Sequence, residues 1–270
     1  MAQDGCDGDI TDRVTVSGDV DTSTAGSYIL TYEVKDSSGN EASMQRTVRV
    51  YAPVQVNTVD PGNKVVYLTF DDGPGPYTAQ LLDVLDKYNV KATFFVTNTR
   101  PDYRTMIAEE AKRGHTVAIH SASHVYSQIY QSEDAYFADL EEMNQIIIEQ
   151  TGQGAQIIRF PGGSSNTVSA KYSRGIMSRL VKDVEARGFL YCDWNVSSGD
   201  AGSRPISTQQ VVQNVTEGMQ KNNVSIVLQH DIKEFSVNAV EQIIQWGLAE
   251  GYTFLPLSTS SPMSHHGVNN

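Results

Sequence analysis

From about residue 64 onwards, short apolar runs alternate with longer helical stretches, and this alternation restricts the chain to few folds. Seven runs are short and apolar enough to be strands: Val65–Phe70, Ala92–Val96, Thr116–Ile119, Gln156–Phe160, Phe189–Trp194, Ser225–Leu228 and Tyr252–Leu257. The stretches expected to be helices are Thr78–Tyr88, Tyr103–Lys112, Asp134–Gln150, Arg174–Arg187, Thr208–Lys221 and Val237–Ala249. Strands joined by helical crossovers form a parallel sheet. We predict an α/β fold in which this sheet closes into a distorted (β/α)7 TIM-like barrel, with an open doubly wound sheet as the competing topology.

Polar residues follow the carboxyl ends of several of these strands. They are Asp71, Asp72, His120, Arg159, Asp193 and His230. In a parallel barrel these ends open on one face, which is where active sites are built. A chance scatter would also place such residues on helices and at strand starts, so we expect one reaction centre.

The spacing of the acids and histidines favours a metal site. Asp71 and Asp72 are adjacent carboxylates, and their proximity raises one pKa unless a cation or an arginine compensates. His120 and His124 have HxxxH spacing, which on a helix puts both imidazoles on one face. No HExxH glutamate lies between them, so the general base must come from elsewhere. One carboxylate and two imidazoles suit a single divalent metal, zinc first, with cobalt, nickel, manganese and iron left open.

Five ordered segments also resemble a known family. They are Thr69–Gly73, His120–His124, Arg159–Ser164, Asp193–Asn195 and Leu228–His230. In this order they resemble the motifs of the polysaccharide deacetylases, carbohydrate esterase family 4, across about residues 63 to 257. The resemblance implies a metal-dependent hydrolase on a distorted seven-stranded barrel. Such enzymes remove N-acetyl groups from chitin-like or peptidoglycan sugars, or O-acetyl groups from xylan.

The resemblance also implies a role for each matched residue. The metal ligands are implied to be Asp72, His120 and His124. Asp71 is then the general base for the attacking water, and His230 the general acid for the departing sugar nitrogen. Asp193 is expected to keep His230 oriented or charged, and Arg159 to tune the base.

Further matched positions would hold the acyl group. The backbone N–H just after Pro161, that of Gly162, is expected to bind the oxyanion. Trp194 and Leu228 are expected to line the slot for the acetyl methyl group. Many family members carry Pro-Tyr-Gly where this chain has Pro161-Gly162-Gly163. We therefore expect a more open sugar-binding cleft without that aromatic wall.

Residues 1–52 lack a helical period and predict strands and turns. Tyr28–Val34 and Ala42–Val50 alternate with the strand period, and Asp36–Asn40 between them has the composition of a hairpin loop. With Asp7–Val14, these segments resemble a bacterial immunoglobulin-like module whose first strands are missing. The module is expected to be a spacer or a β-appendage without a function of its own.

We divide the remaining chain into a linker at 53–62, a deacetylase barrel at 63–260 and a C-terminal tail at 261–270. His265 and His266 are expected to lie in this tail and to be mobile. His115 is expected to be a structural residue at a strand start, and Asp231 to be solvated or to cap a helix.

Charge and hydropathy limit the partners. The formal net charge of −12 argues against nucleic acid and anionic membranes, which need a basic face. No apolar run is long enough to span a bilayer, and the N-terminus lacks signal-peptide character. Either the protein is cytoplasmic or the chain begins after a removed segment, and the immunoglobulin-like module favours an extracellular or cell-surface location. Cys6 and Cys192 have no ligand-like spacing, which disfavours a structural zinc site or a disulfide framework.

The leading hypothesis is a monomeric peptidoglycan N-acetylglucosamine deacetylase acting on an acetylated glycan. A chitooligosaccharide deacetylase or a xylan acetyl esterase is the alternative within the class. A catalytically silent glycan-binding wall protein is a second class, although such a protein would be expected to lose Asp71 or His230. A two-metal phosphoesterase or nuclease is a third, and it would need more ligands and a basic cleft.

Overall fold

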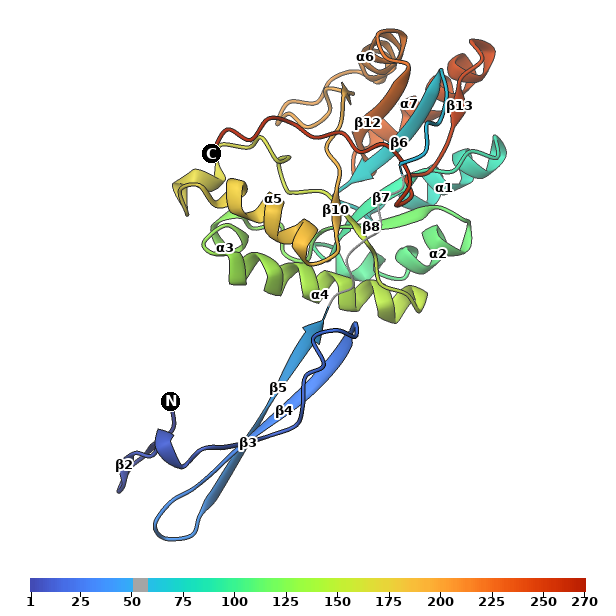
Figure 1. Cartoon of the computed structure of the whole chain (residues 1–270). Helices are drawn as coiled ribbons and strands as arrows, with labels where there is room; N and C mark the ends of the chain where they lie inside the picture. The colour runs from blue at the N-terminus through green and yellow to red at the C-terminus, as the bar shows by residue number, and fades with distance from the viewer. Residues whose placement is uncertain (51–57) are drawn as a thin grey trace. The chain divides into compact units, whose positions relative to one another are not determined.

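The computed structural model describes residues 1–50 and 58–270 (Figure 1). The chain divides into two compact units, Met1–Pro53 and Val54–Asn270. Positions 53–57 of the expected linker lie outside the described residues.

The N-terminal unit is built from antiparallel strands. Its elements are β1 (Gln3–Asp4), β2 (Gly8–Asp9), η1 (Thr11–Arg13), β3 (Thr15–Ser17), β4 (Gly26–Lys35) and β5 (Glu41–Val50). β1 pairs with β2, and β3, β4 and β5 form a sheet in that order. The predicted hairpin is confirmed, since β4 and β5 pair from Lys35↔Glu41 outwards. Its turn is fixed by the Asn40 N–H, which donates to Asp36 Oδ1 at 2.7 Å.

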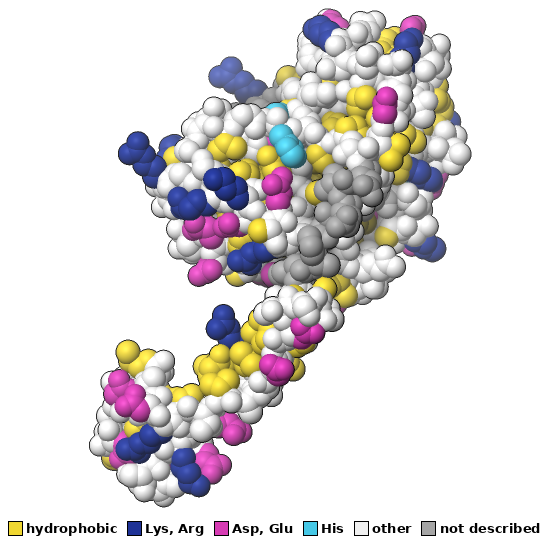
Figure 2. Space-filling model, viewed as in Figure 1, with side chains coloured by type: hydrophobic (Ala, Val, Ile, Leu, Met, Phe, Trp, Pro, Cys, Tyr) yellow, Lys and Arg dark blue, Asp and Glu magenta, His cyan; other side chains and the backbone are white. Residues whose placement is uncertain are grey.

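Large apolar side chains of this unit stay in contact with solvent. Val16 and Ile29 are each 54% exposed and Met44 is 70% exposed, whereas Ile10 is buried. Figure 2 shows hydrophobic side chains along the hairpin. In the described residues the unit has only the short β1-β2 pair beside the three-stranded sheet, and these side chains remain exposed, so the unit lacks the core of a complete sandwich.

The second unit contains one parallel sheet. Its strands are β6 (Val65–Asp71), β7 (Thr93–Thr97), β8 (Thr116–Ser121), β9 (Ile157–Ile158), β10 (Leu190–Tyr191), β11 (Val196–Ser197), β12 (Val224–His230) and β13 (Thr253–Phe254). The strand order is β10-β9-β8-β7-β6-β12-β11, with β13 also pairing with β6. In sequence order the strands run outwards from β6 to β10. The chain then crosses to the opposite edge of the sheet at β11 and comes back inwards to β12, beside β6. In a doubly wound sheet the second half would start beside β6 and run outwards, so the predicted distorted barrel is confirmed.

The helices pack around the outside of this sheet (Figure 1). They are α1 (Thr78–Lys87), α2 (Met106–Lys112), α3 (Tyr126–Ile129), α4 (Glu133–Thr151), α5 (Ile176–Ala186), α6 (Thr208–Gln220) and α7 (Glu234–Ala249), with the 3-10 turns η2 (Pro101–Tyr103) and η3 (Ser169–Lys171). All the expected helices are present, whereas the single turn of α3 and the short strand β11 were not predicted from the sequence. Within the described ranges, every helix is too short or too polar to span a bilayer.

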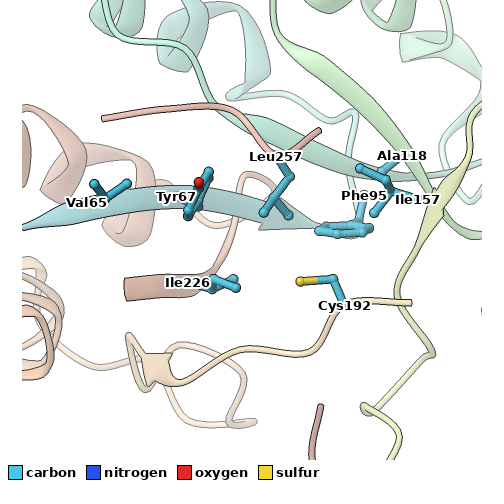
Figure 3. Close-up of a cluster of buried hydrophobic side chains, with 8 residues drawn as sticks. All are labelled: Val65, Tyr67, Phe95, Ala118, Ile157, Cys192, Ile226 and Leu257. Carbon is cyan, nitrogen blue, oxygen red and sulfur yellow. The ribbon is translucent and has the colours of Figure 1, made fainter. Parts of the chain in front are cut away.

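Side chains from successive strands meet in the interior of the barrel. Figure 3 shows this cluster, which consists of Val65, Tyr67, Phe95, Ala118, Ile157, Cys192, Ile226 and Leu257. Alternate residues of a strand point to the same face. Continuing two residues at a time from the interior positions therefore leads to Asp71, His120, Arg159 and His230. The alternation that builds the core also aims these four side chains into the carboxyl-terminal mouth of the barrel.

Candidate active site

The two adjacent aspartates point in different directions. Asp71 ends β6 and is 3% exposed, whereas Asp72 has a left-handed backbone with φ of 71°. The loop after them is tied to β7, because the Thr97 hydroxyl donates to the Asp72 carbonyl at 3.0 Å. Gly73 packs on the carboxyl group of Asp231, and a Cβ at this glycine would lie 2.2 Å from both carboxyl oxygens. Only glycine fits at this position of the loop.

The two histidines are not presented by a helix, as the HxxxH spacing suggested. His120 lies near the end of β8, where the register with β7 shifts, and His124 follows in a tight turn with φ of 54°. Asp139 of α4 holds this turn, because it accepts the Ser121 hydroxyl at 2.6 Å and two backbone N–H groups at 2.8 and 2.9 Å. The β-bulge in β8 and the turn held by the Asp139 carboxylate therefore bring the two imidazoles together.

The three expected ligands do converge. The ligand atoms of Asp72, His120 and His124 all lie within 4.8 Å of one another. Asp72 Oδ1 is 3.5 Å from Nε2 of His120 and 3.3 Å from Nε2 of His124. Among the described residues this oxygen is buried without a hydrogen-bond partner, and a buried carboxylate oxygen is costly unless it is compensated. A divalent cation would compensate it, so the residues fit a metal.

Protonation in this cluster favours metal binding. Nδ1 of His120 donates to the Arg159 carbonyl at 2.8 Å, which leaves the lone pair of a neutral ring on Nε2, facing Asp72. Burial lowers the pKa of His120 and keeps the ring neutral. Burial by itself would raise the pKa of Asp72, but the positive charge that His120, His124, His230 and Arg100 carry when protonated outweighs it and lowers that pKa. A neutral imidazole and an ionised carboxylate are the forms that bind a metal.

Arg159 is fully buried and forms an ion pair with Asp71, the carboxylate that it was expected to tune. Its Nη1 donates to Asp71 Oδ1 at 2.7 Å and to the Thr69 hydroxyl at 2.6 Å. Its Nε and Nη2 donate to the carbonyls of Cys192 and Asp193 at 2.8 and 2.9 Å. Each guanidinium nitrogen thus has a partner, as a buried charge requires. Because the arginine holds Oδ1 of Asp71, the other carboxyl oxygen remains available on the side of His120, 3.9 Å from Nε2.

The carboxylate that holds His230 is Asp200, and the expectation that Asp193 would do so is wrong. Nδ1 of His230 lies 2.7 Å from Asp200 Oδ1. Oδ2 of Asp200 accepts the His230 backbone N–H at 2.8 Å and the Ser236 hydroxyl at 2.6 Å. Asp200 follows β11, which pairs directly with β12, and this places it behind His230. Identifying β11 as a strand in the sequence would have revealed this carboxylate.

The environment of His230 favours its charged form. Burial opposes the charge, but the hydrogen bond and charge of Asp200, with smaller effects of Asp71 and Asp72, raise the pKa of His230 to about 8. The pKa of Asp200 is lowered, because its bonds to His230 and Ser236 outweigh burial. Nε2 of His230 faces the ligand cluster, 3.8 Å from Asp72 Oδ2.

Asp193 instead ties together the loop after β9 and the C-terminal tail. It accepts the backbone N–H and hydroxyl of Ser164, and the backbone N–H of His266 at 2.8 Å. Nε2 of His266 lies 2.6 Å from the Trp194 carbonyl, and the ring of His265 stacks on Tyr191 at 3.9 Å. The expectation of a mobile tail is therefore wrong, since these rings pack on the barrel.

The expected acyl site lies in the loop after Phe160. Gly162 and Gly163 have left-handed φ values of 79° and 78°. A Cβ on Gly162 would lie 2.6 Å from the Tyr126 hydroxyl oxygen. Tyr126 of α3 therefore occupies the space that a side chain at position 162 would take, and the expectation of a more open sugar-binding cleft remains a prediction.

The other expected lining residues have the following positions. Leu228 is buried on β12, and Trp194 is partly buried with its ring against Gly163. The Pro161 carbonyl accepts the Tyr130 hydroxyl at 2.8 Å, which fixes the start of the loop.

Two expected structural residues lie outside the centre. His115 is structural, as expected, and its Nδ1 accepts the Ala92 N–H at 3.1 Å. Asp231 is not solvated. It is completely buried and accepts the Thr78 hydroxyl, and burial raises its pKa to about 7.

Comparison with known proteins identifies the architecture. Residues 58–177 match the family model described as polysaccharide deacetylase, and residues 1–50 match the bacterial surface protein Ig-like domain. The crystal structure of the catalytic domain of peptidoglycan N-acetylglucosamine deacetylase from Eubacterium rectale is 78% identical, with a TM-score of 0.79, and the match covers 80% of this chain and 98% of that one.

Two curated relatives are more distant. A Bacillus cereus peptidoglycan-N-acetylglucosamine deacetylase is 33% identical over 71% of this chain and 68% of its own length. A bifunctional xylanase/deacetylase of Pseudobutyrivibrio xylanivorans is 31% identical over 76% of this chain and 31% of its own length.

Proposed function

The chain belongs to the polysaccharide deacetylase family, and we propose that its substrate is the N-acetylglucosamine of peptidoglycan. As a member of this family, it is a metal-dependent hydrolase that acts on the amide bond of an acetylated glycan. The single observation that carries our assignment of residues is the placement of Asp71 and His230 around one ligand cluster, each held by a buried partner.

The ligand cluster defines what a cation would do. Asp72, His120 and His124 would hold one divalent ion, for which zinc is our proposal because two imidazoles and a carboxylate suit it. When bound, such an ion lowers the pKa of a coordinated water and polarises the acyl oxygen.

Proton transfer is assigned to residues on either side of the cluster. Asp71 accepts the proton of the attacking water at the carboxyl oxygen that Arg159 leaves free. His230 donates the proton from Nε2 to the departing amine, and its raised pKa of about 8 keeps it charged near neutral pH. Asp200 holds the imidazole by Nδ1, so that Nε2 faces the substrate. The Gly162 N–H binds the acyl oxygen as negative charge develops there.

The choice of sugar rests on the relatives. Those named peptidoglycan N-acetylglucosamine deacetylases include a structure with 78% identity that matches most of this chain. Peptidoglycan lies outside the cytoplasmic membrane, so we also propose an extracellular or cell-surface location. The N-terminal unit would then be a spacer, residues 63–260 the catalytic barrel, and 261–270 a tail docked on it.

The direct test is acetate release by the zinc-loaded protein from peptidoglycan and from N-acetylglucosamine oligomers. We expect release from both and one metal ion per chain. Release from acetylated xylan alone would assign the protein to the esterase branch. A loaded protein that binds the glycans without releasing acetate would be a silent wall-binding protein, and two metals per chain would favour a phosphoesterase.

A further inference from the structure

Tyr126 stands beside the metal ligands and is fixed there by aromatic contacts. It begins α3, two residues after His124, and its ring meets the His124 ring edge-on at 5.7 Å. On its other side it packs against Tyr130 at 5.5 Å. The Tyr130 hydroxyl is bonded to the Pro161 carbonyl, so this ring pair is anchored to the loop that carries Gly162.

The hydroxyl of Tyr126 reaches the backbone of that loop. A Cβ on Gly162 would come within 2.6 Å of the hydroxyl oxygen and 3.5 Å of the ring atom Cε1. Two features therefore require a glycine at position 162. Its φ of 79° is strained for other residues, and Tyr126 fills the space that a side chain would take. The phenol and the Gly162 N–H, the donor assigned to the acyl oxygen, thus border the same region.

The hydroxyl is available as a hydrogen-bond donor. Within the described part of the chain no residue accepts a hydrogen bond from it, and the side chain is partly exposed. Tyr130 cannot play the same part, because its hydroxyl is already bonded to Pro161.

We propose that Tyr126 contacts the substrate as a second donor to the acyl oxygen, alongside the Gly162 N–H, while its ring closes the adjacent side of the acyl site. The inference deepens the proposed function and rests on it. No proton leaves the phenol. The hydrogen bond shortens as the carbonyl oxygen gains charge in the transition state, so the contribution is to the chemical step more than to substrate binding.

The test is Tyr126→Phe, which keeps the ring and removes only the donor. Loss of one oxyanion donor costs about 10²-fold or more where it has been measured, and for this partly exposed phenol we expect kcat to fall by about tenfold or more. KM should stay within about twofold, because ground-state contacts are retained. Zinc content after dialysis, melting temperature and both limbs of the pH–rate profile should match the wild type. Tyr172→Phe, at an exposed tyrosine far along the chain, is the matched control and should change none of these quantities.

Each alternative outcome has a separate meaning. A kcat of Tyr126→Phe equal to that of the wild type overturns the proposal. Loss of zinc in proportion to activity also overturns the proposal and assigns the tyrosine to the metal site. A shift of either limb of the pH–rate profile overturns it as well and assigns the tyrosine to proton transfer. If the phenylalanine variant melts early, its kcat and KM are measured with those of the wild type at a temperature well below its melting transition, where the same comparison applies. Failure of the proposed function is distinct, because the wild-type protein itself would then release no acetate.

Discussion

The adjacent residues Asp71 and Asp72 have different roles in this site because their backbone conformations differ. Asp71 continues the strand alternation into the barrel and meets Arg159. Asp72 follows in the left-handed region and turns towards the histidines. The same carboxylate is therefore an arginine-held base at one position and a metal ligand at the next, and substitutions at the two sites should have separable effects.

Asp71→Asn should abolish most turnover while the metal stays bound. The amide oxygen can still accept from Arg159, but the side chain can no longer take a proton, so acetate release should fall by about 10²- to 10⁴-fold. His120→Ala should lose the metal as well, because a ligand is removed. Both are measured as zinc per chain after dialysis, together with the rate of acetate release. Retained zinc in His120→Ala would contradict its assignment as a ligand.

Asp200→Asn should move the alkaline limb of the kcat profile to lower pH. The carboxylate raises the pKa of His230 to about 8, and removing its charge lowers the pKa. The general acid is then deprotonated at lower pH, so activity is lost earlier as pH rises. Asp193→Asn is the matched comparison, because Asp193 does not contact His230 and its loss should leave the position of that limb unchanged. Equal displacement in both variants would count against the Asp200–His230 pair.

At the scale of elements, α2 buries a carboxyl group that the chemistry does not use. Glu110 is completely buried, and both of its carboxyl oxygens lack a partner among the described residues. Burial, reinforced by the charge of Asp231, raises the pKa of Glu110 well above its ordinary value. The folded helix therefore retains a proton that the unfolded chain releases above about pH 4.5. Stability should decline as pH rises through that window towards the folded pKa, by at most about 1.4 kcal/mol per pH unit.

Glu110→Gln should remove this pH dependence. The amide is of similar size and does not titrate, so the variant should gain stability relative to the wild type between pH 5 and pH 8. Urea unfolding at both pH values measures the difference. Glu109→Gln, on the same helix but partly exposed, should behave as the wild type does. A difference between Glu110→Gln and the wild type that is constant with pH would show that the acid is ionised in the folded protein.

At the scale of the whole molecule, the reaction centre belongs to one unit. Every residue assigned to it lies between Asp71 and His230, within the unit Val54–Asn270. Its members come from β6 and β8 with the turns that follow them, from the loops after β9 and β11, and from β12. These segments are brought together because the chain returns beside β6 after moving outwards to β10. The N-terminal unit supplies none of them, although it displays apolar side chains to solvent.

Removal of Met1–Pro53 should therefore leave catalysis on small substrates unchanged. We expect kcat/KM for soluble N-acetylglucosamine oligomers within about twofold of the whole chain, because no ligand, base or acid is lost. A spacer role would appear only with insoluble peptidoglycan, where the shortened chain should release acetate more slowly. A large loss of activity on the soluble oligomers would show that the first unit contributes to the site.

The sequence alone determined most of the strands and helices of the barrel, α3 and β11 excepted, and it showed which strand ends carry reactive side chains. Those properties are local, because the hydrophobic period, and the face of the sheet to which a strand residue points, are set within a few residues of each position. Asp71, His120, Arg159 and His230 could be assigned to one mouth for that reason. Only the tertiary structure decided that Asp200 supports His230, that Asp139 stitches the histidine turn, and that Tyr126 fills the space beside Gly162. These three reach the site through segments whose direction is fixed by contacts distant in the sequence, and no local pattern specifies such contacts.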